Sequence, residues 1–145
     1  GAPRIQQLHD QYVRLEQVLQ VADWQARAEA ARARLVAIEN RFWSAESEGL
    51  ARAEFQIQLE RMAARADFEL LGTELRSLVP IQAIPGWYRL GATLQGRRDP
   101  AALVRLLGAL ADGERLVMVD GVRIGGENAR SRLDVHAVIR IEPES

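Results

Sequence analysis

The sequence contains no cysteine, no lysine and only two histidines among its 145 residues. Without cysteine there can be no disulfide, no thiolate catalysis and no cysteine-ligated metal. The 19 basic residues are all arginine, and 20 acidic residues offset them, so the formal net charge is −1. A nucleic-acid-binding domain usually carries a clear excess of positive charge, so this balance argues against a nucleic-acid partner.

Aromatic residues and long apolar runs are also scarce. Aromatic residues make up 6% of the chain, whereas apolar residues as a group make up 48%. A core is therefore available, and it must be mainly aliphatic. No stretch approaches the roughly 20 consecutive apolar residues of a membrane span. The length suits one domain, or one small domain with an extension.

The first third of the chain lacks helix breakers. Between residues 4 and 45 there is no glycine or proline, and alanine, leucine, glutamine, glutamate and arginine predominate, all of which favour helix. Leu8, Tyr12, Leu15 and Leu19 recur at alternating steps of four and three residues, which is a heptad-like seam. A helix of about 40 residues would extend roughly 60 Å, too long for a compact domain, so we expect a projecting stalk over residues 1–46. The alternative is two ordinary helices with a break near residues 21–24.

After residue 46 the pattern reads helix, strand, strand, and then repeats that order. The second helix has Asp99 as its expected N-cap and Pro100 at its first position. In the last strand, Leu133, Val135 and Ala137 alternate with polar residues, as in a sheet covered on one face. We therefore predict an α+β fold for residues 47–145. It is a permuted ferredoxin-like domain, with a four-stranded antiparallel sheet and two helices on one face. The second and fourth strands should be central, and this domain should fold without the stalk.

The sequence offers little for catalysis. His9 and His136 fall on different elements, and a metal site would require them close together. Asp120 precedes Gly121, which favours a carboxylate at a bulge or turn over a general base. No nucleophile can be matched with a base. We therefore predict no enzyme activity, no cofactor, no metal and no small-molecule substrate.

Candidate docking residues fall into two groups. The stalk seam of Leu8, Tyr12, Leu15 and Leu19 would support self-association. If one sheet face is open, it should carry an apolar patch, which an isolated domain does not need. The residues expected in that patch are Trp87, Val117, Val119 and Val138. Phe42 and Trp43, at the junction of stalk and domain, would either pack in the domain or contact a partner.

Two segments carry a family resemblance. They are FWSAESEGLARAEFQIQLERMAARADFELLGTELRSLVP and YRLGATLQGRRDPAALVRLLGALADGERLVMVDGVRI. The first contains a pattern L-A-x-A-x-x-Q-x-x-L-x-x-x-A that starts at Leu50 and is followed by a strand ending in proline. Over residues 41–143 the chain resembles the periplasmic domain of type II secretion system protein M, subtype b. Asp67 stands where that family usually has glycine, and aspartate tolerates left-handed dihedrals better than most residues.

This resemblance implies a non-enzymatic component of the inner-membrane platform that drives export of folded proteins. Members of the family have one N-terminal membrane helix, bind protein L of the same machine and often form homodimers. We accordingly expect a membrane span upstream of Ile5, with the present residues in the periplasm. The related pilus-assembly proteins share the fold and are the first alternative. A ferredoxin-like small-molecule sensor with a signalling helix is the second.

Overall fold

The structure, a computed structural model, describes residues 2–126 and 129–142. The chain divides into two compact units, Gly1–Glu39 and Asn40–Ser145. Helix α1, Ala2–Arg41, accounts for the first unit and contributes its last two residues to the second. It is one uninterrupted helix, because nothing between residues 4 and 41 removes a backbone donor or favours a turn. In the described part of the chain, no helix is both long and apolar enough to cross a membrane.

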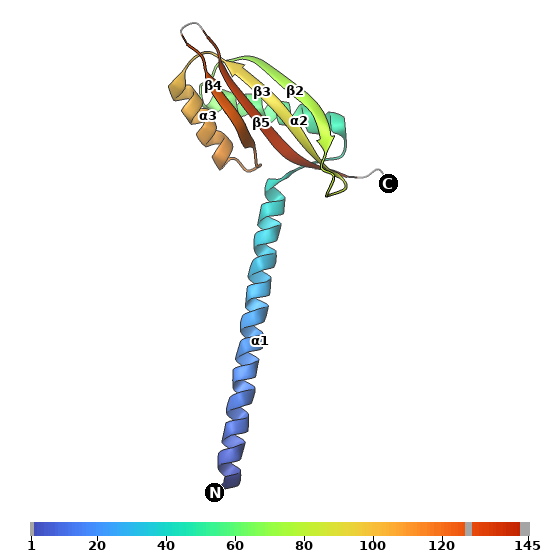
Figure 1. Ribbon diagram of the computed structural model, residues 1–145, viewed down its shortest axis with the longest axis vertical. Coiled ribbons are helices and arrows are strands. Elements are labelled where there is room, and N and C mark those ends of the chain that lie inside the picture. Colours follow the sequence, from blue (N-terminus) through green and yellow to red (C-terminus); the bar gives the residue numbers. More distant parts are fainter. Residues whose placement is uncertain (1, 127–128, 143–145) are drawn as a thin grey trace. The chain divides into compact units, whose positions relative to one another are not determined.

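The described residues of the second unit form five strands and two helices. Figure 1 labels the two helices and the four longer strands. The predicted order of helix, strand, strand, given twice, is confirmed, and one short strand precedes it. The elements are β1 (Trp43–Ala45), α2 (Glu48–Arg65), β2 (Leu70–Pro80), β3 (Trp87–Gly96), α3 (Pro100–Asp112), β4 (Met118–Ile124) and β5 (Ser131–Ile141).

The sheet is five-stranded and mixed, so the predicted four-stranded antiparallel sheet is wrong in this respect. β3 and β5 pair antiparallel at the centre, β2 lies beside β3, and β4 lies beside β5, as expected. The addition is β1, which pairs parallel with the end of β5 from Trp43↔Ile139 to Ala45↔Ile141. Three residues are too few to show an alternating pattern, which is why the sequence did not indicate this strand.

Burial of Trp43 explains why β1 joins the sheet. Its side chain is 3% exposed and packs edge-on against Phe55, with ring centroids 5.3 Å apart. Its indole Nε1 donates a hydrogen bond to the carbonyl oxygen of Leu116 at 3.1 Å. A buried indole usually needs such a partner. Residues 43–45, which the sequence assigned to the stalk, therefore belong to the sheet.

Local signals set the ends of the two shorter helices. The side chain of Ser47 accepts a hydrogen bond from the backbone N–H of Leu50 and caps α2. Asp99 caps α3 through the N–H of Ala102, as predicted, with Pro100 next in the chain. After α2 ends, the chain turns at Asp67, whose backbone φ is 54°. This is the left-handed region that aspartate enters more readily than most residues.

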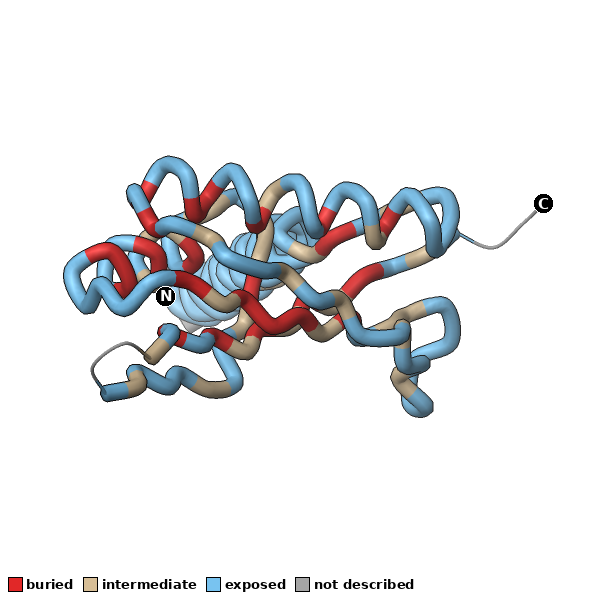
Figure 2. The backbone as a smooth tube through the Cα atoms, turned by 90° about the horizontal axis from the view of Figure 1, so that it is seen from above, coloured by how far each residue is buried: buried red, intermediate tan, exposed pale blue. Residues whose placement is uncertain are grey.

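One face of the sheet carries the core. In Figure 2 the buried positions, in red, lie on the central strands and on the inner sides of the helices. Phe55 and Leu59 of α2 and Leu106 of α3 are fully buried there. The strands contribute alternate residues to the same layer: Leu90, Ala92 and Leu94 of β3, and Leu133, Val135, Ala137 and Ile139 of β5. The inward set predicted for β5 is confirmed, and neither α2 nor α3, the helices of the second unit in the described residues, covers the opposite sheet face.

β2 departs from simple alternation at two places. One register shift, at a bulge, lies between Leu70 and Gly72. A second irregularity between Leu75 and Leu78 was not predicted. Because an extra residue there reverses the alternation, Leu75 and Leu78 both pack against the core, whereas Val79 is exposed.

Candidate docking surfaces

The seam on α1 is exposed along its whole length. Leu8, Tyr12, Leu15 and Leu19 keep 62, 66, 58 and 61% of their surface accessible. Apolar side chains left in water raise the free energy of the chain in proportion to their area. The seam is therefore available for a partner helix, and self-association through it stays a prediction.

Of the four residues predicted for an apolar patch on the open sheet face, Val117 and Val119 do not lie there. Val117 is 6% exposed and belongs to the core. Val119 lies opposite Val135, so it sits on the helix-covered side of the sheet. The reason is an irregularity between Val119 and Gly121, at Asp120, which reverses the alternation of β4.

Trp87 and Val138 do lie on the open side, because they pair with Arg140 and Arg89 there. Trp87 packs edge-on against Phe42, with centroids 5.4 Å apart and the rings at 86°. Phe42 and Trp43 are thus both engaged within the second unit, which confirms the packing interpretation. Trp87 is left only partly accessible and is not an exposed aromatic anchor.

The sheet face opposite the helices, which we call the open face, carries a polar network centred on Asp134. Its Oδ1 accepts hydrogen bonds from Thr93 Oγ1 at 2.7 Å and from Arg76 Nη2 at 3.0 Å, and Arg132 lies 3.4 Å away. Arg76 also bonds Thr93, and it crosses Gly91, where a Cβ atom would come within 3.0 Å of its Nη1. The hydroxyl of Thr93, helped by the two guanidinium groups, holds the pKa of Asp134 below its ordinary 3.8 against the opposing effect of partial burial.

A second cluster lies beside it on β4 and β5. His136 Nδ1 is 2.7 and 2.8 Å from the two carboxylate oxygens of Asp120, and Arg89 Nη2 is 3.5 Å from the first. Asp120 occupies the β4 irregularity, so the prediction of a bulge carboxylate is confirmed. His9 belongs to the other unit. The described residues contain no cluster of three or more side chains able to hold a metal ion.

Basic residues outnumber acidic ones on the open face. Strand register and side-chain contacts place six arginines there: Arg76, Arg89, Arg123, Arg130, Arg132 and Arg140. They also place three carboxylates there: Glu74, Asp120 and Asp134. Composition alone could not indicate this excess of basic residues, because acidic and basic residues nearly cancel over the whole chain. The sequence signal that could have indicated the basic face was the outward set of the last strand, which includes Arg132 and Arg140.

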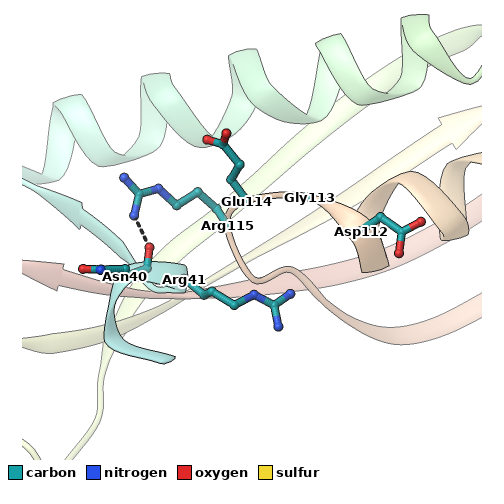
Figure 3. A pocket seen from close by; sticks show the side chains of 6 residues that line it. All are labelled: Asn40, Arg41, Asp112, Gly113, Glu114 and Arg115. Carbon is teal, nitrogen blue, oxygen red and sulfur yellow. Dashed lines mark hydrogen bonds between the residues drawn. The ribbon is translucent and has the colours of Figure 1, made fainter. Parts of the chain in front are cut away.

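A hollow of about 560 Å³ lies at the turn between α3 and β4 (Figure 3). Arg115, one of its lining residues, donates from Nη1 to the carbonyl oxygens of Asn40 at 2.5 Å and Phe42 at 3.1 Å. The next residue, Leu116, donates its N–H to the carbonyl oxygen of Arg41 at 2.7 Å. These bonds satisfy carbonyls that the end of α1 would otherwise leave unpaired. The hollow therefore lies within the second unit, where its first residues are bonded to the turn between α3 and β4.

No family model matches the chain, and no curated protein matches it. Similar solved structures come from Akkermansia muciniphila. One crystal structure aligns with a TM-score of 0.50 and 14% identity, over 83% of this chain and 78% of that one. A second structure, solved without its transmembrane region, aligns with a TM-score of 0.47 and 14% identity, over 83% of this chain and 86% of that one. A third structure, of a core domain, aligns with a TM-score of 0.44 and 14% identity, over 81% of this chain and 86% of that one. The first supports the α+β fold, with a long N-terminal helix followed by a mixed sheet, and at this identity the likeness concerns fold alone.

Proposed function

We propose that the chain is a non-enzymatic assembly component of a type II secretion inner-membrane platform. In this proposal it acts in the periplasm, is anchored by one membrane helix and binds protein L. The observation that carries the proposal is a single long helix with an exposed apolar seam, joined to an α+β unit covered on only one sheet face. Both features leave large surfaces for partners.

A residue-level observation adds support. Asp67 follows α2 with a φ of 54°, at the position where the protein M family usually has glycine. A left-handed residue is a common way to end a helix. The family's glycine and this aspartate would therefore serve the same turn.

We further propose that α2, α3 and the four longer strands form a permuted ferredoxin-like arrangement. The order of α2, β2, β3, α3, β4 and β5, with β3 and β5 central, fits that description. β1 would then be an addition that continues the edge occupied by β4, since both strands pair with β5 at successive positions.

The polar clusters of the open face fit a docking role without chemistry. Asp134 is engaged by Thr93 and Arg76, and Asp120 is engaged by His136 and Arg89. A general base must be free to reach a proton on a substrate. These carboxylates are instead committed to neighbouring strands, where they hold the arginines in place.

Deletion of the gene in the bacterium that encodes the chain tests the proposal and separates it from the pilus-assembly alternative. We expect folded proteins normally exported to the medium to accumulate in the periplasm, and export to return with a plasmid-borne copy. Surface pili should be unchanged. Loss of pili with normal export would replace the secretion role by the pilus role, and normal levels of both would contradict an assembly role in either machine.

A further inference from the structure

Two arginines face each other across adjacent strands of the open face. Arg123 of β4 is the register partner of Arg132 of β5. Directly opposite residues of an antiparallel pair project to the same side, and like charges in that position destabilise the sheet. Nothing in the packing of the core requires this pair, because both side chains are exposed.

The same end of the face gathers a third arginine. Arg130 Nη1 lies 3.4 Å from Gln95 Oε1, and Gln95 is the register partner of Arg132. At the other end of β5, Arg140 lies opposite Trp87. Among the described residues that strand register and side-chain contacts place on this face, six arginines stand against three carboxylates, so these residues make it positive, although the whole chain has a net charge of −1.

The carboxylates do not cancel the charge evenly. Asp134 and Asp120 lie in the middle of the face and engage Arg76, Arg132 and Arg89. Within residues 2–126 and 129–142, no ion pair involves Arg123 or Arg140. Among the described residues, the guanidinium groups of the face that have no ion pair are therefore at its two ends, and ion-paired groups lie between them.

We propose that the open face docks an acidic segment of a partner protein. Guanidinium groups bind carboxylates through paired, charge-assisted hydrogen bonds. A partner carboxylate between Arg123 and Arg132 would turn a repulsive pair into a favourable site. Complementary charge of this kind mainly sets specificity and the rate of association. The proposal deepens the docking role proposed above by naming the chemistry of the partner.

Membranes and nucleic acids fit the face less well. An anionic bilayer or a phosphate backbone would bring negative charge against the central carboxylates as well as the ends of the face, whereas a protein segment can place its carboxylates at the ends alone. Single-stranded nucleic acids are usually held by aromatic stacking platforms. On this face the aromatic side chain in the described strands is Trp87, and its ring is already packed edge-on against Phe42.

Binding of labelled poly-L-glutamate to the full chain, followed by fluorescence anisotropy, tests the proposal. The test variant is Arg123→Glu with Arg140→Glu. The matched control is Arg61→Glu with Arg65→Glu, two exposed arginines of α2 with the same change in charge. We expect about tenfold weaker binding for the test variant, little change for the control, and weaker binding of the parent as salt rises.

A thermal melt shows whether the variants are folded. Arg123→Glu alone should not lower the melting temperature, because it replaces a like-charge pair by an ion pair with Arg132. Equal loss of binding in test and control variants would overturn the proposal. So would preferential binding of phosphatidylglycerol vesicles or of a single-stranded oligonucleotide through the same arginines. The secretion phenotype described above does not depend on this outcome, so the two proposals can fail separately.

Discussion

At the residue scale, the open face depends on a few polar contacts between neighbouring strands. Asp134 on β5 is held by Thr93 on β3 and Arg76 on β2. Thr93 is 5% exposed although it is polar, so its hydroxyl depends on these bonds. A buried hydroxyl that loses its partner costs free energy. The network therefore fixes where the arginines project as well as contributing to stability.

Thr93→Val should raise the pKa of Asp134 toward its ordinary 3.8, because the largest cause of the lowering is the Thr93 hydrogen bond. A lowered carboxyl pKa stabilises the folded state above the unfolded pKa, and that contribution is lost as pH falls through the folded pKa. Below pH 3.8 the parent should consequently lose more stability than the variant. An NMR titration of Asp134 provides the measurement, and Thr93→Ser is the control that keeps the hydroxyl. An unchanged pKa in the valine variant would contradict this assignment.

Gly96→Ala should destabilise the second unit, because a Cβ atom there would lie 2.4 Å from the Phe68 ring and 2.8 Å from the Glu69 carbonyl oxygen. Overpacking of this kind costs about 1–3 kcal/mol. Gly72→Ala is the matched control, since it lies on neighbouring β2 with nothing within 4 Å of the added atom. Urea unfolding of both variants measures the difference. Equal stabilities would mean that Phe68 can move aside at little cost.

At the element scale, α1 shows how directly sequence can specify structure. The absence of glycine and proline predicted one long helix, and the structure has one from Ala2 to Arg41. The alternation in β5 likewise gave the correct inward residues, because a one-sided sheet repeats every two residues.

The elements that could not be predicted are those in which long-range pairing overrides local pattern. β1 exists because Trp43 is buried against Phe55 and bonded to Leu116, which are distant in sequence. The irregularities in β2 and β4 reverse which residues face the core, and no local signal marked the second of the two in β2. Val117 and Val119 were wrongly predicted for the open face for this reason, and the basic excess of that face became visible only with the strand register.

The stalk should associate through its seam. Leu15→Glu with Leu19→Glu should abolish a dimer formed by the parent, because it places charge in the apolar seam. Burying each leucine contributes about 1.5–3 kcal/mol, and the entropy lost on association offsets much of the total. We therefore expect a weak parent dimer, with a Kd of about micromolar order.

Light scattering over a range of concentrations measures this association. Gln6→Glu with Gln17→Glu is the control, since both residues lie on the opposite side of a helix with about 3.6 residues per turn. That variant should still dimerise. A dimer that survives in the Leu15 and Leu19 variant would place the interface in the second unit.

At the scale of the whole molecule, the boundary between the units falls before β1. A chain beginning at Asn40 should retain a cooperative thermal transition, because it keeps Trp43 and every strand of the sheet. A chain beginning at Glu46 should be much less stable, since loss of a large buried aromatic side chain costs about 3–5 kcal/mol. Calorimetry compares the two. Equal melting temperatures would show that β1 contributes little, and the boundary would return to residue 46.

We propose that this chain works by docking to protein L of a type II secretion platform. Isothermal titration of the purified chain with the periplasmic domain of protein L from the same bacterium measures that contact directly. We predict saturable binding with a defined stoichiometry. The absence of binding, with both proteins folded by their thermal transitions and at concentrations well above micromolar, would contradict the account.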